Sequence, residues 1–183
     1  MNNLQLIISG VGGQGILFVT RILAETAIRE GIPVMTSETH GMAQRGGVVI
    51  SHLKVGDFSS PLVRPGRADG LIAMKEENIA LHRYFLRPGG WVIVNAKAAP
   101  AELDGSPAHA IDADTLALEL GSPQAVNLIL LGFALARLAP HKSLFCTPQD
   151  VIETVRQRLA EKESLRAASL KALMVGCEQG GYV

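Results

Sequence analysis

Gly10-Val11-Gly12-Gly13-Gln14-Gly15 follows the apolar stretch Leu4–Ile8 and precedes a segment whose apolar residues recur at helical spacing. A G-x-G-x-x-G pattern between a strand and a helix is typical of a dinucleotide-binding unit. Gly10 permits a tight turn, Gly12 lets a phosphate approach the N–H groups of the helix start, and Gly15 lets the helix lie close to the strand. A tight turn that binds nothing is the alternative. The predicted cofactor-binding residues are Gly10, Gly12, Gly13, Gln14 and Gly15.

Strand-like and helix-like segments alternate along the rest of the chain. Short β-rich runs predict strands at Pro33–Thr36, Val48–Val55, Gly70–Met74 and Trp91–Val94. Helical spacing and capping residues predict helices at Gln14–Glu30, Glu76–Leu86, Ala125–Leu138, Thr147–Leu159 and Ser164–Glu178, with a surface connection at Ala98–His109. This order predicts one α/β domain over residues 1–183, doubly wound around a mostly parallel, Rossmann-like sheet.

Composition limits the class of protein. The chain has 183 residues, with 17 Lys and Arg against 17 Asp and Glu, which fits one domain. A sequence-independent nucleic-acid binder needs a basic face, so the balanced charge argues against that class, although a local basic patch stays open. The longest apolar run, Leu128–Ala136, is shorter than the ~20 residues of a membrane span and predicts a core helix. No basic leader is present, and we expect a cytoplasmic protein without a membrane partner.

Cys146 and Cys177 are the only cysteines, and no CxxC occurs. The chain therefore lacks the thiolates for an iron–sulfur cluster or a Cys-rich zinc site of its own. Two buried free thiols are expected, with a disulfide as the alternative. No His, Asp or Glu grouping has metal-ligand spacing, and His52 and His82 are expected to be core or edge histidines with satisfied hydrogen bonds. No metal site and no complete catalytic set are predicted in this chain.

The stretch 38–47 places an acid, an imidazole, an amide and a guanidinium among glycines. It is predicted to be a loop that faces a partner or a shared active site, and its residues of interest are Glu38, His40, Gln44, Arg45, Gly46 and Gly47. A solvated loop with Glu38 paired to Arg45 is the alternative. Glu38 also lies 23 residues after Gly15, close to where an acid binds an NAD ribose, but the strand before it is short and contains Pro33.

The two glycine motifs together resemble the gamma subunit or domain of 2-oxoacid:ferredoxin oxidoreductases. Glu38-Thr39-His40-Gly41-Met42-Ala43-Gln44-Arg45-Gly46-Gly47 is most similar to the beta subunit of the indolepyruvate enzymes in this family. Asn127 and Gly132 support the resemblance, which covers nearly the whole chain. Lys75 stands near a position where family members often carry glutamate, and Ser169 stands near an expected asparagine. These two departures put in doubt a role for the acid and one helix contact.

The resemblance implies a division of labour. The complete enzyme decarboxylates a 2-oxoacid such as indolepyruvate, forms an acyl-CoA and reduces ferredoxin. Thiamine diphosphate, Mg and iron–sulfur clusters are then expected on partner subunits, and ferredoxin is reached through the complex. This chain would contribute to assembly, bind no cofactor firmly, be inactive alone, and supply a coenzyme A site.

Two other functions compete with this one. The chain could be a free-standing NAD(P)-dependent reductase that uses Gly10–Gly15 and Glu38, but no Tyr-x-x-x-Lys or clear His/Arg placement accompanies them. It could also be a nucleotide-sensing regulatory module. Neighbouring genes for a thiamine diphosphate subunit and a ferredoxin-type protein would favour the oxidoreductase subunit.

Overall fold

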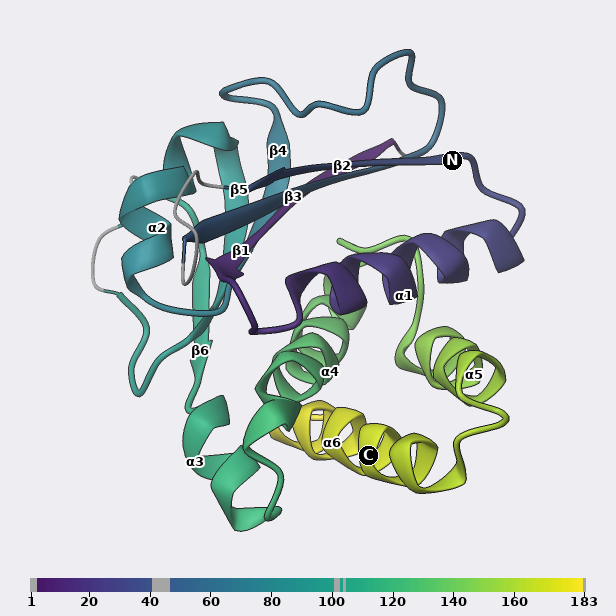
Figure 1. The fold of residues 1–183 in the computed structure, drawn as a ribbon. Coiled ribbons are helices and arrows are strands. Elements are labelled where there is room, and N and C mark those ends of the chain that lie inside the picture. Colours follow the sequence, from purple (N-terminus) through teal and green to yellow (C-terminus); the bar gives the residue numbers. More distant parts are fainter. Residues whose placement is uncertain (1–2, 41–46, 101–102, 104, 183) are drawn as a thin grey trace.

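A six-stranded sheet with helices on both faces forms the described part of the chain (Figure 1). The structure, a computed structural model, describes residues 3–40, 47–100, 103 and 105–182. The strands are β1 (Leu4–Val11), β2 (Val34–His40), β3 (Val48–Val55), β4 (Ala68–Ala73), β5 (Leu86–Asn95) and β6 (Ala108–Ile111). The α-helices are α1 (Ile16–Arg29), α2 (Glu77–His82), α3 (Ala113–Glu119), α4 (Val126–Leu138), α5 (Pro148–Arg158) and α6 (Glu163–Gln179). Short 3-10 turns are η1 (Arg83–Phe85), η2 (Pro123–Ala125) and η3 (Ala139–His141).

The strand order is β2-β3-β1-β4-β5-β6. β1, β4, β5 and β6 pair in parallel, as expected for buried strands joined by crossovers. β3 stands between β1 and β2 and runs antiparallel to both of them. The predicted α/β class is confirmed, and the sheet is mixed: β3 alone runs against the other strands of the described sheet.

Several predicted boundaries were wrong. The helix expected at Glu76–Leu86 ends at His82, and the strand expected at Trp91–Val94 begins at Leu86. The strand expected at Pro33–Thr36 continues to His40, because it pairs with β3 from Val34–Val55 to His40–Val49. Glu38, Thr39 and His40 therefore belong to a strand and not to a loop. The connection expected at Ala98–His109 contains the start of β6, a short edge strand that forms by pairing with β5.

The helices divide unequally between the two faces of the sheet. α1 and α4 cover one face, and α5 and α6 form a second helical layer outside them (Figure 1). The other face is covered by α2, η1 and the connection before β4. One helical stretch among the described residues, Pro123–His141, has the length and apolar composition of a membrane span. In this fold 67% of its most apolar window is buried. The prediction of a core helix is confirmed, because Asn127–Ala136 is buried throughout.

Candidate functional site

The glycine loop joins the end of β1 to the start of α1. The side chain of Gln14 holds the loop, because its Oε1 accepts a hydrogen bond of 2.8 Å from the Val11 N–H. The Gln14 N–H donates to the Val11 carbonyl at 3.2 Å. Gln14 thus shapes the loop through its carbonyl oxygen, and its predicted contact with a cofactor stays a prediction.

The glycines have partly different roles from those expected. Gly13 and Gly15 have φ values of 93° and 74°, a region that L side chains rarely adopt. A Cβ on Gly10 would come within 2.9 Å of Met74 Cβ, so this glycine lets β1 lie close to the residue after β4. A Cβ on Gly15 would collide with Asn127 Nδ2 of α4. Gly15 therefore allows a close approach of α4, where the sequence predicted an approach of the strand.

The start of α1 presents open hydrogen-bond donors. Gly15 is the N-cap and provides no side-chain cap. Among the described residues, the N–H groups of Gly13, Gly15, Ile16 and Leu17 find no acceptor. Helix N-termini carry a partial positive charge, so these four N–H groups can donate hydrogen bonds to an anion.

This loop lies at the point where the chain reverses its winding. β1 leads into α1 on one face of the sheet, and the adjacent parallel strand β4 leads into α2 on the other. The Met74 N–H donates to the Ser9 carbonyl at 2.8 Å and joins the two strand ends. In open α/β sheets, ligands bind outside the carboxyl ends of the strands at such a switch point.

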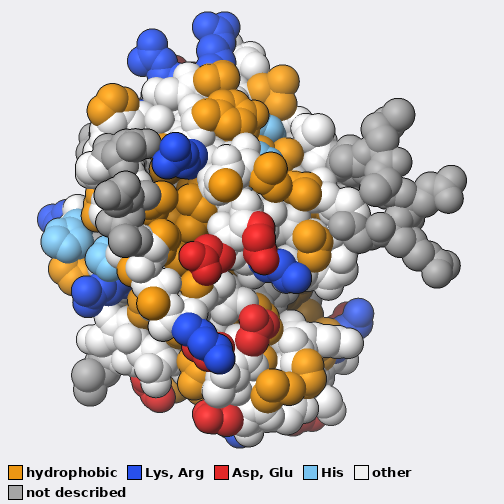
Figure 2. All heavy atoms as spheres, turned by 90° about the vertical axis from the view of Figure 1, so that its left-hand side faces the viewer, with side chains coloured by type: hydrophobic (Ala, Val, Ile, Leu, Met, Phe, Trp, Pro, Cys, Tyr) orange, Lys and Arg blue, Asp and Glu red, His pale blue; other side chains and the backbone are white. Residues whose placement is uncertain are grey.

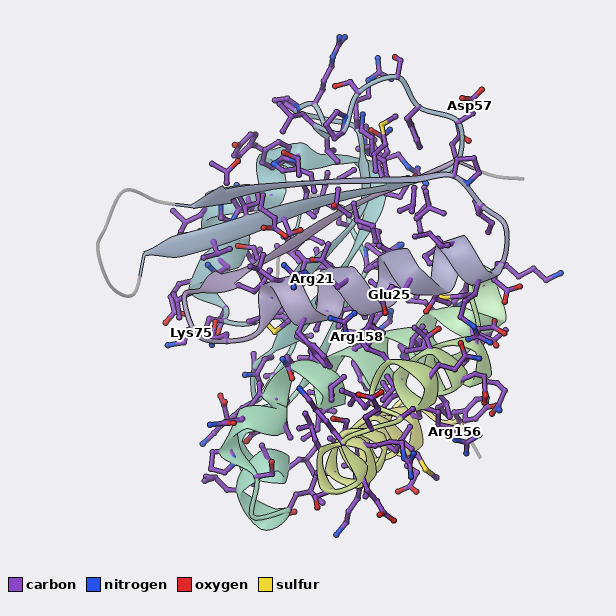
Figure 3. All side chains as sticks on the ribbon, turned by 45° about the vertical axis from the view of Figure 1, so that its right-hand side comes forward. Arg21, Glu25, Asp57, Lys75, Arg156 and Arg158 are labelled. Carbon is purple, nitrogen blue, oxygen red and sulfur yellow. The ribbon has the colours of Figure 1, made fainter. Side chains whose placement is uncertain are left out.

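Cationic side chains border the same region. An open cavity of about 430 Å³ lies at the glycine loop, and Arg21 and Phe18 are among its lining residues. Figure 3 shows Arg21 and Glu25 along α1, with Arg158 of α5 beside Glu25. Arg158 forms the ion pair with Glu25, while Arg21 is in none of the ion pairs between described residues. Lys75 follows Met74 and is exposed at the same sheet edge.

A polar cluster lies at the end of β1, on the α2 side. Ser9 Oγ is 2.7 Å from His82 Nδ1, and Ser9 is fully buried. Burial lowers the pKa of His82, and a hydrogen bond to the Asn78 backbone opposes this shift. Asn78 Oδ1 is buried and has no hydrogen-bond partner among the described residues. His82 was expected to be a satisfied core or edge histidine; its side chain is half-buried and bonds to Ser9. Nothing in the sequence pattern indicated which residue it meets.

The second glycine motif meets the first one. The Gly12 N–H donates to the Gly47 carbonyl at 3.0 Å, and Val11 pairs with Val48 across β1 and β3. Glu38 and His40 lie on β2. Gln44, Arg45 and Gly46 lie outside the described residues, so their predicted roles stay predictions. Because β3 separates β2 from β1, Glu38 is not on the strand next to the glycine loop, which weakens the NAD alternative.

Neither cysteine is suited to nucleophilic chemistry. Both are free and buried, which confirms the expected thiols. Burial raises the pKa of Cys177 to about 11, with Glu178 adding to the shift, and burial raises the pKa of Cys146 further. Within the described ranges, no group of three or more His, Cys, Asp or Glu side chains could hold a metal ion.

Comparisons with known proteins agree with this fold. Residues 5–179 match the pyruvate ferredoxin/flavodoxin oxidoreductase family. The chain is 32% identical over 196 residues to the indolepyruvate oxidoreductase subunit IorB of Archaeoglobus fulgidus, covering 96% of this chain and 94% of that protein. A keto/oxoacid ferredoxin oxidoreductase gamma subunit from Geobacter sulfurreducens has a TM-score of 0.77 at 23% identity, covering 98% of this chain and 99% of that one.

A larger protein contains the same fold as one part. The 2-oxoglutarate:ferredoxin oxidoreductase of Magnetococcus marinus, solved with 2-oxoglutarate, coenzyme A and succinyl-CoA, has a TM-score of 0.82 at 22% identity. The match covers 100% of this chain and 32% of that one. The resemblance to gamma subunits found in the two glycine motifs is thereby confirmed. The chain belongs to the pyruvate ferredoxin/flavodoxin oxidoreductase family.

Proposed function

We propose that this chain is the gamma-type subunit of a cytoplasmic, heteromeric 2-oxoacid:ferredoxin oxidoreductase and that its glycine loop binds the phosphate end of coenzyme A. Partner subunits would carry thiamine diphosphate, Mg and iron–sulfur clusters, which supply decarboxylation and electron transfer to ferredoxin. The described residues support this division, because they contain buried thiols and no candidate metal cluster. An indole-bearing 2-oxoacid is the proposed substrate of the complex, by analogy with the Archaeoglobus relative.

The main support for the coenzyme A site is the group of N–H donors without acceptors at the start of α1, which lies at the switch point of the sheet. The free N–H groups of Ile16 and Leu17 suit a phosphate, and Arg21 adds a guanidinium within the same cavity. Lys75 can approach from the end of β4. Coenzyme A combines a phosphate-rich end with a long neutral arm, so this site can hold the former while the thiol reaches a partner subunit.

The stretch 38–47 is proposed to face that partner or the shared active site. Its carboxyl-terminal end contacts the glycine loop through the bond from Gly12 to Gly47, so a ligand at the loop and a partner at this stretch would be neighbours. Arg45 is the proposed anchor for a carboxylate or phosphate. Replacing Arg45→Ala should weaken co-purification with the thiamine diphosphate subunit or reduce turnover; wild-type assembly with wild-type turnover would exclude the role.

Reconstitution tests the proposed function. The chain and its partner subunits are purified separately, and reduction of a dye is measured with a series of 2-oxoacids and coenzyme A. Turnover is expected after mixing and from neither part alone. A 2-oxoacid-independent, NAD(P)H-dependent activity of the isolated chain would instead support the reductase alternative.

Charge-removal variants test the phosphate site within that complex. Arg21→Gln and Lys75→Gln should each raise the KM for coenzyme A by about two- to fivefold, as expected for partly exposed ion pairs. Arg156→Gln is the matched control, because Arg156 lies on α5 and pairs with Glu153 at 3.2 Å. Equal KM values for all three variants would place the phosphates elsewhere.

A further inference from the structure

A second cavity lies at the opposite end of the sheet from the glycine loop. Its volume is about 800 Å³, within the range of small-molecule sites. Residues at or near the amino ends of the parallel strands form one wall, including Leu4, Asp69, Arg87 and Trp91. The segment after α4 forms the other wall. The glycine loop, at the carboxyl ends of the strands, takes no part in it.

The strand wall carries a guanidinium held in place. Arg87 Nε donates to Asp69 Oδ1 at 2.7 Å, and the Gln5 N–H donates to Asp69 Oδ2 at 2.8 Å. Both Asp69 oxygens are therefore engaged, and Asp69 is the one carboxylate among the described lining residues. Arg87 Nη1 donates to the Pro88 carbonyl at 3.3 Å, and Nη2 has no acceptor among the described residues.

Further nitrogen donors lie at or near the cavity, on β6, at the end of α4 and in the segment after α4. Arg137 Nε donates to His109 Nδ1 at 3.3 Å, which leaves the proton of neutral His109 on Nε2. Burial is the largest cause that lowers the pKa of His109, and the nearby Arg137 and His141 lower it further. No ion pair between described residues includes Arg137 or Lys142. At the left edge of Figure 2, histidine side chains likewise lie beside Lys and Arg side chains.

Backbone strain also falls at this cavity. Lys142 has φ 50°, and it is the one non-glycine residue with positive φ in the described chain. Such a conformation is strained in L-residues and persists where the surroundings hold it. It places a lysine on the cavity wall next to His141. The rest of the lining is largely apolar and includes Trp91 and Phe145.

We propose that this cavity binds a small organic anion. Its carboxylate or phosphate is held by Arg87, His109, His141 and Lys142, and its apolar body lies against Trp91 and Phe145. The anion would bring negative charge to Lys142 and to the Arg87 guanidinium, beside which Asp69 is the one carboxylate among the described lining residues. This site does not depend on the proposed coenzyme A site.

Trp91 provides a direct readout, because it is the only tryptophan in the chain and is 6% exposed. The full chain is titrated with phenyl phosphate, phenylacetate and the neutral analogue benzyl alcohol while Trp91 fluorescence is recorded. A saturable change with at least one anion, at least about tenfold tighter than with benzyl alcohol, is expected from charge-assisted hydrogen bonds. The tighter anion identifies the head group. No saturable change, or equal binding of the alcohol, would overturn the proposal.

Variants then locate the binding. The double change His141→Gln and Lys142→Gln should weaken the preferred anion by about tenfold. Lys142→Gly removes the same charge while suiting the positive φ, so it separates lost binding from poor folding. Lys171→Gln on α6 and Arg156→Gln on α5 should bind as the wild type does. Wild-type binding by the double variant and by Lys142→Gly, or equal loss in the two controls, would overturn the assignment.

Discussion

Replacing Gly15 by alanine should destabilise the chain more than replacing Gly13. Both glycines have positive φ, so alanine at either position costs about 1–2 kcal/mol of backbone strain. A Cβ at Gly13 meets nothing within 4 Å, whereas a Cβ at Gly15 collides with Asn127 Nδ2. Overpacking of this kind costs about 1–3 kcal/mol more. The expected losses in the free energy of unfolding are therefore about 1–2 kcal/mol for Gly13→Ala and about 2–5 kcal/mol for Gly15→Ala.

The assay is urea denaturation followed by far-UV circular dichroism, with Gly13→Ala as the matched control. Asn127 Nδ2 donates a long bond of 3.4 Å to the Gly15 carbonyl, so Asn127→Ala alone should cost about 1 kcal/mol. In the double variant the collision is absent, and the loss should be smaller than the sum of the single losses by about 1–2 kcal/mol. Equal losses for Gly13→Ala and Gly15→Ala, with an additive double variant, would refute the close approach of α4 to the loop.

Three further predictions follow from the packing. Thr147→Ala should lower the free energy of unfolding by about 1 kcal/mol, measured by urea denaturation, because it removes the capping box at the start of α5. Burial is the main cause that holds the pKa values of His52 and His82 below 6.5. The unfolded chain therefore binds more protons at low pH. The free energy of unfolding should be constant from about pH 6.5 to about pH 8, below the range in which the cysteines of the unfolded chain titrate, and should decrease as the pH falls below about 6.5. His52→Asn should flatten that decrease, and an unchanged pH profile would contradict this. Cys146 and Cys177 should react with a thiol reagent only after denaturant is added, as their raised pKa values and burial require; rapid labelling of the native chain would be inconsistent with the structure.

Local signals were sufficient for much of the fold. Leu6–Ile8 and Trp91–Val94 are continuous apolar runs, and such runs are typical of buried strands in parallel sheets. Thr147, Pro148 and Asp150 form a capping box within one turn, so the sequence alone indicated it. Asp112 is likewise a local cap of α3, because its Oδ1 accepts a hydrogen bond of 3.0 Å from the Thr115 N–H.

Features that depend on distant pairing could not be predicted. The direction of β3 and the full length of β2 follow from the register between Val34–His40 and Val48–Val55, which no local pattern specifies. β6 is a four-residue edge strand and becomes a strand only by pairing with β5. The bond from Gly12 to Gly47 and the pairing of Ser9 with His82 likewise join segments far apart in the chain.

The most direct test of the coenzyme A site is the KM for coenzyme A of complexes that contain Gly12→Val. Among the described glycines, Gly12 is not one of those with positive φ, so valine obstructs a phosphate without the strain expected at Gly13 or Gly15. If the glycine loop binds the phosphates, the KM for coenzyme A should rise by at least about tenfold, because one or two charge-assisted hydrogen bonds are lost. The KM for the 2-oxoacid should be unchanged. An unchanged KM for coenzyme A in a folded, assembled Gly12→Val complex would contradict it.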